Sequence, residues 1–486
     1  MIRVRAFILS ASLSIICATG ANAHQGHAAP PWQQSSVWPD RIVVTLPDDP
    51  ATSFAVTWRT SADVENSVAE IAVATPDARF DLAAESRTAV SEELDLATVK
   101  RLGADVPVEW NSMLAPVRFH SVTFDGLEPD TLYAYRVRGA DSAWSEWYQV
   151  RTAPVDGPIS FIYVGDAQNG ILSHWARTIR AAFQTAPDAR FILHAGDLVN
   201  RASRDFEWAE WFKSVGFIHG MIPAMPVAGN HEYDRIGLPE DTTSRILSIL
   251  WRPQFTLPVE ETLHADLRET VYDVRYTKDL HLFVLDTQAG RIDEQAEWLD
   301  KALSESDARW RIVSMHHPIF SSGRGRDNAD RRQILLPVFL KHNVDLVLQG
   351  HDHTYARGLI PQDDTTQTPE RIAMGDTDLI KTMFVNSVSG AKQYTFKDDR
   401  WDGYTSDGVE LKNYAENTQF FQVVRIYGNT LSYTAYTATR EIYDSFVMTK
   451  GEDAVKTLLE GSGSTIDLRL FESTMPYPGV SDLSAE

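Results

Sequence analysis

Short apolar runs, each followed by a polar cluster, constrain this chain more than any other feature. Residues 161–164, 282–285 and 346–348 are continuous apolar stretches, which is typical of strands buried on both faces. Apolar residues recur at helical spacing over 293–303 and 330–341, between such runs. This alternation predicts an α/β domain in which helices cover a sheet.

Five apolar runs of this kind along the chain are followed by residues that bind metals well. The carboxyl ends of strands in α/β sheets form the crevice where ligands bind, so we expect these side chains to meet there. Oxygen and imidazole donors without any thiolate suit Mn, Fe, Zn or Co. In chain order, the residues are Asp166 with Gln168, Asp197, Asn230 with His231, His316, and His351 with His353.

A different pattern precedes this domain. Residues 53–58, 119–124 and 132–137 alternate apolar and polar side chains and are separated by turn residues, which predicts an all-β sandwich. The turn at 126–131 before the strand at 132–137 resembles a corner of fibronectin type III domains, and Trp58 stands where such domains bury a Trp.

The first residues predict export. Arg3 and Arg5 precede an apolar stretch at 6–18, which is shorter than the roughly 20 residues that span a bilayer. Ala21-Asn22-Ala23 then has the small-x-small pattern of a cleavage site, so we expect a signal peptide over 1–23 and a periplasmic or secreted protein. No later run is long and apolar enough for a membrane span.

Composition excludes other classes. The formal net charge of −22 argues against nucleic acid as a partner, because the phosphate backbone would be repelled. The single Cys excludes a disulfide scaffold and a Cys-ligated zinc module. The sequence leaves the oligomeric state open.

The ordered motifs identify a family. Asp166-x-Gln168, Gly196-Asp197, Gly229-Asn230-His231-Glu232, His316 and Gly350-His351-x-His353 resemble the pattern of calcineurin-like metallophosphoesterases. The sandwich in front and the text from Leu335 to Tyr355 are similar to the purple acid phosphatase branch. The resemblance implies a β-sandwich catalytic core flanked by helices, so the fold class we expect is an all-β sandwich followed by an α/β (α+β) metallophosphoesterase domain.

The resemblance also implies two metal ions, divalent or trivalent. Asp197 would bridge them. Asp166, Gln168 and His353 would complete the shell of the first. Asn230, His316 and His351 would complete the shell of the second, and His231 would stand beside the leaving group as a catalytic residue.

The chain departs from the family pattern twice. Purple enzymes have an iron-binding Tyr three residues after the bridging Asp, where this chain has Asn200, so we expect no tyrosinate colour. The wider family has His where this chain has Gln168. A neutral amide is a weaker donor than imidazole, so Gln168 is either a loosely binding ligand or the group that orients a metal-bound water.

The family implies an exported phosphatase that hydrolyses small phosphomonoesters by attack of a metal-bound hydroxide. A phosphodiesterase or phospholipase-like hydrolase on the same metal core, and a non-catalytic surface binding protein, are the alternatives. We expect His317, Arg324 and Arg326 to contact the substrate phosphate. Glu232 either orients the His231 ring or is a surface carboxylate.

The expected domains are a signal peptide at 1–23, a fibronectin type III-like sandwich at 38–154, a catalytic domain at 158–445 and a C-terminal tail at 446–486.

Overall fold

A computed structural model describes residues 30–461, except 48, 99–110, 112, 236–244, 363–377 and 453. The expected signal peptide and the last 25 residues lie outside the described residues. Within the described part of the chain, no helix is long and apolar enough to cross a membrane.

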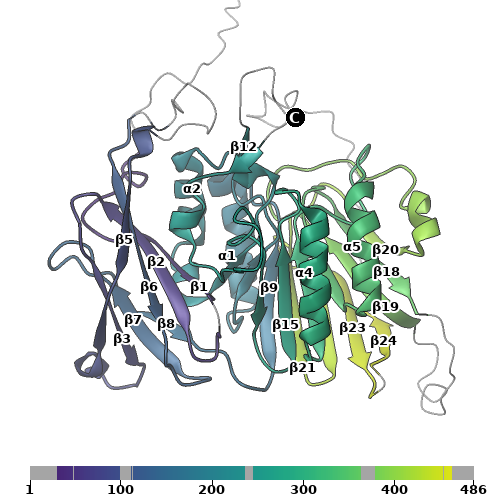
Figure 1. Cartoon of the computed structure of the whole chain (residues 1–486), viewed down its shortest axis with the longest axis horizontal. Helices are drawn as coiled ribbons and strands as arrows, with labels where there is room; N and C mark the ends of the chain where they lie inside the picture. The colour runs from purple at the N-terminus through teal and green to yellow at the C-terminus, as the bar shows by residue number, and fades with distance from the viewer. Residues whose placement is uncertain are drawn as a thin grey trace, which may run out of the picture.

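The N-terminal domain is the expected β-sandwich (Figure 1). One sheet has the order β1–β2–β6–β5 and the other the order β4–β3–β7–β8. Trp58, Phe54 and Tyr135 pack between them because alternate side chains of each strand face inward. The strands are β1 (Asp40–Thr45), β2 (Phe54–Ser61), β3 (Val68–Val73), β4 (Glu85–Thr88), β5 (Val90–Leu94), β6 (Val117–Phe124), β7 (Leu132–Val137) and β8 (Tyr148–Arg151).

The catalytic domain contains two facing sheets, so the expected core is confirmed. The first has the order β11–β10–β9–β21–β22–β23. The second has the order β14–β15–β16–β17–β19–β18–β20. The strands are β9 (Ile159–Val164), β10 (Ile192–His194), β11 (Ala224–Pro226), β14 (Tyr272–Arg275), β15 (Leu280–Leu285), β16 (Trp310–Met315), β17 (Leu346–Gln349), β18 (Tyr355–Pro361), β19 (Asp378–Asn386), β20 (Glu410–Ala415), β21 (Phe420–Tyr427), β22 (Thr430–Thr437) and β23 (Ile442–Lys450).

Helices cover these sheets. Ile312 and Leu346 of the second sheet join the core shared with the first sheet, whereas Val313 and Val347 face α4 and α5, as the period of two requires. A π-helical turn (Ile171–Trp175) precedes α1, and a short hairpin of β12 (Tyr233–Arg235) and β13 (Arg245–Leu247) follows the third motif. The helices are α1 (Ala176–Thr185), α2 (Asp205–Val215), α3 (Ile218–Met221), α4 (Ile292–Glu305) and α5 (Ala329–Lys341).

The two domains share a sheet edge. β1 pairs antiparallel with β2 and, through Thr45 and Ala224, parallel with β11, so the sandwich continues into the first catalytic sheet. α3 packs against β1 and β8, which closes the other side of the junction.

The end of the chain differs from our expectation. We expected a tail from residue 446, but β23 continues to Lys450 and β24 (Lys456–Glu460) pairs with both β23 and β19. β24 therefore joins the edges of the two catalytic sheets. Apolar content alone underestimated this segment because Lys456, although charged, is fully buried and paired with Asp345.

Candidate metal and catalytic site

Strand ends bring the motif residues together. Asp166 and Asp197 follow β9 and β10 of the first sheet, and His316 and His351 follow β16 and β17 of the second. Asp166, Asp197 and His351 have positive φ angles of 50°, 53° and 75°, a backbone region that non-glycine residues adopt uncommonly and that is frequent at functional sites.

One group of donors consists of two aspartates that follow strands of the first sheet, together with the second histidine of the His-x-His motif. Ligand atoms of Asp166, Asp197 and His353 all lie within 4.8 Å of one another. Nε2 of His353 is 3.4 Å from Oδ1 of Asp166. All three side chains are buried.

The second group shares Asp197 with the first. Ligand atoms of Asp197, His316 and His351 also lie within 4.8 Å of one another. Nε2 of His316 is 3.2 Å from Oδ2 of Asp197 and 3.1 Å from Oδ1 of Asn230, while Nδ1 of His351 is 2.9 Å from the same Asn230 oxygen. The two groups therefore meet at one carboxylate.

Backbone carbonyls orient the imidazole rings of His316 and His353. Nδ1–H of His316 donates to Ala195 O at 2.8 Å, and Nδ1–H of His353 donates to Lys392 O at 2.8 Å. Each bond fixes the tautomer and directs Nε2 into the cluster, as in metal sites whose ligands are held by outer hydrogen bonds.

Burial and neighbouring charges shift the pKa values of the clustered groups. Burial raises the pKa of Asp166 to about 8, and the charge of Asp197 adds to this rise. Burial alone would raise the pKa of Asp197, but His316 and His231 lower it overall. Burial lowers the pKa of His351 and of His353 well below the ordinary value, so both rings are neutral and able to bind a cation.

Gln168 lies inside the first group. Its Nε2 is 2.6 Å from Oδ2 of Asp197 and 3.1 Å from Nε2 of His353, and its Oε1 is buried without a partner among the described residues. Turning the amide by 180° exchanges the two atoms and places the oxygen among the ligand atoms. The orphaned acceptor is consistent with a bound cation.

These donors fit two metal ions. Two triads that share Asp197, the unpaired amide oxygen of Gln168 and the neutral rings of His351 and His353 form a donor set of the kind that metal ions require. Asp166 and His316 would release a proton on binding metal, because burial raises the pKa of Asp166 to about 8 and, against the effect of burial, Asp197 raises the pKa of His316 to about 9. Asp166, Asp197, Gln168 and His353 would hold one ion. Asp197, Asn230, His316 and His351 would hold the other.

His231 lies beside the cluster and is held from the Asn200 position. Its Nδ1–H donates to Asn200 O at 2.7 Å, which leaves Nε2 3.9 Å from Oδ2 of Asp197. The residue that replaces the iron-binding Tyr of purple enzymes thus positions this imidazole through its backbone.

Glu232 has a role that neither of our alternatives described. It is fully buried and accepts backbone N–H groups of Asp197 (2.8 Å), Leu198 (2.9 Å) and Gly229 (2.7 Å). It therefore fixes the loop that presents Asp197 rather than the His231 ring. The sequence left a contact with the His231 ring and a surface position as alternatives, because it does not show which amides the fold leaves unpaired.

The three expected substrate contacts have different surroundings. Nη1 of Arg326 donates to Nε2 of His351 at 2.6 Å, and the His317 ring lies 4.3 Å from the His351 ring. Arg324 instead pairs with Asp398 at 2.7 Å on the exposed surface. The Gly-rich loop turns between the two arginines, at Gly325, which has a φ of 75°.

Sequence reasoning missed Lys392 and Tyr394. Lys392 is 9% exposed, and its charge lowers the pKa of His353 in addition to the effect of burial. The centre of the Tyr394 ring lies 4.6 Å from the Arg326 guanidinium carbon and 5.3 Å from the Lys392 ammonium. The signal was available, since both residues follow the sixth apolar strand, β19, at the same sheet edge.

Family models match both domains. Residues 159–355 match calcineurin-like phosphoesterase, and residues 39–152 match the purple acid phosphatase N-terminal domain. Residues 159–355 are therefore a calcineurin-like metallophosphoesterase domain. This match confirms the resemblance that the five motifs indicated. It identifies the second domain as a metal-dependent phosphoesterase domain.

Relatives of this chain include bacterial and plant proteins. An uncharacterized protein of Mycobacterium tuberculosis (strain H37Rv) is 30% identical over 52% of this chain and 54% of its own length. Purple acid phosphatase 15 of Arabidopsis thaliana is 27% identical over 49% of each chain. The chain thus spans about half the length of these curated relatives.

Two solved structures share the fold. A purple acid phosphatase from yellow lupin seeds covers 86% of this chain and 75% of its own, with a TM-score of 0.65 and 17% identity. PhoD covers 88% of this chain and 93% of its own, with a TM-score of 0.60 and 13% identity.

Proposed function

We propose that this metallophosphoesterase is an exported phosphatase that hydrolyses small phosphomonoesters with two metal ions. The observation that carries the proposal is the pair of donor triads that share Asp197. Mn, Fe, Zn and Co all suit these donors. When bound, two such ions neutralise phosphate charge and make water a nucleophile near neutral pH.

The chain's own groups complete the chemistry. In its imidazolium form, His231 gives the Nε2 proton to the leaving oxygen, while its Nδ1–H stays bonded to Asn200 O and keeps the ring in place. Arg326 and Lys392, which both lie against the Tyr394 ring, bind phosphate oxygens of the substrate. The His317 ring packs against the His351 ring and fills the space beside these phosphate-binding residues.

The same proposal assigns the remaining segments. Residues 1–23 are the cleaved signal peptide, residues 38–154 are a fibronectin type III-like domain and residues 158–445 are the catalytic domain, with β24 added to it. The contact of Glu128 N–H with Tyr133 Oη at 2.9 Å supports the fibronectin-like corner.

Asp197 tests the shared metal ligand. We expect Asp197→Asn to lose turnover of nitrophenyl phosphate and to bind less metal by elemental analysis, whereas Asp398→Asn, at an exposed carboxylate, changes neither. Comparison of nitrophenyl phosphate with bis-nitrophenyl phosphate separates monoesterase from diesterase activity. An Asp197→Asn protein with two metals and normal kcat would refute the proposal.

His231 tests acid catalysis. His231→Ala should keep both metals and lose about 10²–10⁴-fold in kcat on glycerol phosphate. It should lose less on nitrophenyl phosphate, because nitrophenolate departs without a proton. His264→Ala, at an exposed histidine outside the site, is the control. Equal losses on both substrates with intact metals would leave phosphate binding, not proton donation, as the role of His231.

A further inference from the structure

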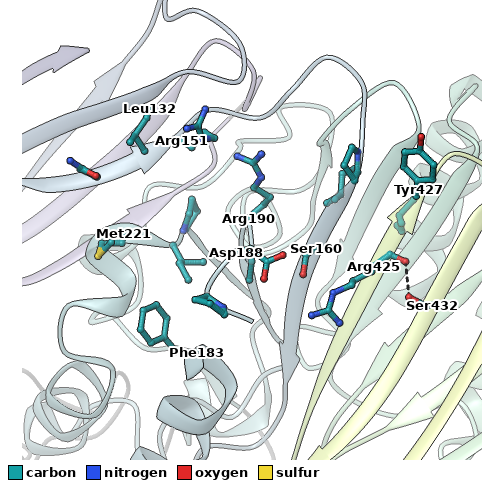
Figure 2. A pocket seen from close by; sticks show the side chains of 18 of the residues that line it. Leu132, Arg151, Ser160, Phe183, Asp188, Arg190, Met221, Arg425, Tyr427 and Ser432 are labelled. Atoms are coloured by element: carbon teal, nitrogen blue, oxygen red, sulfur yellow. Dashed lines mark hydrogen bonds between the residues drawn. The ribbon is translucent and has the colours of Figure 1, made fainter. Parts of the chain in front are cut away.

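A cavity lies at the junction of the two domains, at the opposite end of β9 from Asp166. Its volume is about 790 Å³, within the range of small-molecule sites. Strands β7 and β8 of the sandwich line one side, through Leu132 and Arg151, and the start of β9 lines the other (Figure 2).

One wall of the cavity is apolar. Phe183 near the end of α1 and Met221 at the end of α3 lie together on this side, with Ile222 and Pro223 after them (Figure 2). Met221 is 37% exposed, a large apolar side chain left open to the cavity. A hydrocarbon or aromatic group placed here would bury this surface.

The facing wall presents a row of polar side chains. Ser160 of β9, Arg425 of β21 and Ser432 of β22 are direct cross-strand partners, so they lie side by side on one face of the sheet. Ser160 is 7% exposed, and its Oγ has no partner among the described residues. The Arg425 guanidinium likewise forms no ion pair or hydrogen bond within the described part of the chain.

The other charged groups of the cavity favour an anion. Arg151 and Arg190 line it as well, and Oδ1 of Asp130 lies 3.7 Å and 3.2 Å from their guanidinium nitrogens. Asp188 is the single carboxylate among the lining residues. Three guanidinium groups on a chain of net charge −22 form a local positive site, with Arg425 free to bind.

We propose that this junction cavity binds a small organic anion with an apolar body. Its carboxylate pairs with the Arg425 guanidinium and accepts the Ser160 hydroxyl hydrogen, and its body packs on Phe183 and Met221. An Arg–carboxylate pair uses two parallel hydrogen bonds and discriminates against neutral groups. Because sandwich strands line the same cavity, the ligand contacts both domains and stabilises their junction.

Calorimetric titration of the full chain tests this site, with octanoate and 2-naphthoate as probes. Titrations are made on metal-loaded and on chelator-treated protein. We expect both anions to bind equally well to the two forms, since the cavity contains none of the metal ligands. In the chelator-treated protein, octan-1-ol, which lacks the charge, and inorganic phosphate, which lacks the body, should bind at least about tenfold more weakly than the two carboxylates, a difference of about 1.4 kcal/mol.

Variants assign the contact. Arg425→Gln should weaken octanoate binding about tenfold or more, and Ser160→Ala should weaken it by a smaller factor. Arg440→Gln, an exposed arginine at the turn between β22 and β23, should bind like the unaltered chain. Far-UV circular dichroism confirms that each variant is folded, and Ser160→Ala tests the site independently if Arg425→Gln fails to fold.

Three outcomes would overturn the proposal. Neither carboxylate binds the unaltered chain at millimolar concentration, or octan-1-ol binds as tightly as octanoate, or both Arg425→Gln and Ser160→Ala bind octanoate normally.

Discussion

At the scale of single residues, Gln168 is the departure with the clearest chemical consequence. Its amide stands beside Asp197 and His353, where the family pattern has an imidazole. We predict that Gln168→His binds metal more tightly, because imidazole is a stronger donor than an amide. The gain should be at least comparable with the change of about 10–100-fold in metal affinity that follows from altering residues that only hydrogen-bond to ligands. Titration with a chelator, followed by elemental analysis, measures the gain. Equal metal loss from both proteins would show that Gln168 is not a ligand.

Also at the scale of single residues, a substitution of Lys392 distinguishes phosphate binding from metal binding. Its backbone carbonyl holds His353, whereas its ammonium lies beside Tyr394, so a side-chain substitution leaves the His353 contact in place. We predict that Lys392→Ala raises KM and the inhibition constant of inorganic phosphate about tenfold, since charged hydrogen bonds contribute about 1.5–3 kcal/mol. Metal content should stay constant, and Lys412→Ala, outside the site, should behave like the unaltered chain. A loss of metal in Lys392→Ala would assign it a structural role.

At the scale of elements, β6 contains a buried histidine that makes the sandwich sensitive to acid. His120 stacks on Trp58 at 5.4 Å and bonds Thr60 Oγ1 at 2.8 Å and Ser91 Oγ at 2.7 Å. Burial lowers its pKa from 6.5 to about 4, with a smaller effect from Arg118. Between these values the unfolded chain binds a proton that the folded chain does not, so stability falls as the pH decreases from 6.5 toward 4.

This shift predicts a measurable difference between two proteins. From pH 7 to pH 5, the unaltered chain should lose about 2 kcal/mol more unfolding free energy than His120→Gln, because one pKa unit corresponds to about 1.36 kcal/mol. Urea unfolding of both full chains at the two pH values gives the comparison. Parallel pH dependences would contradict the assigned burial of His120.

At the scale of the whole molecule, a buried ion network joins the two domains. Asp205, the first residue of α2, lies 2.8 Å from Nη1 of Arg41 and 3.7 Å from Nη1 of Arg59, which come from β1 and β2. All three are buried. We predict that Asp205→Ala destabilises the protein by about 3–5 kcal/mol, because it leaves the buried Arg41 guanidinium unpaired, whereas Arg59 keeps its pair with Asp40. Replacing Arg41 with Met in the same chain should recover part of this loss in thermal unfolding. A neutral Asp205→Ala would show that water reaches the junction.

The sequence by itself determined the main apolar strands and what chemistry their ends present. Continuous apolar runs such as 161–164 and 346–348 reflect local burial, and Asp166, Asp197 and His351 follow them directly, so pattern and spacing were sufficient. The tertiary structure decided what depends on segments far apart in the chain. Glu232 is a buried clamp because the Asp197 loop offers it unpaired amides, and β24 belongs to the fold because two sheet edges meet it. The junction cavity likewise exists only where β9 passes the sandwich. Such contacts arise from the packing of distant strands, and local apolar periodicity contains no information about which strands will be neighbours.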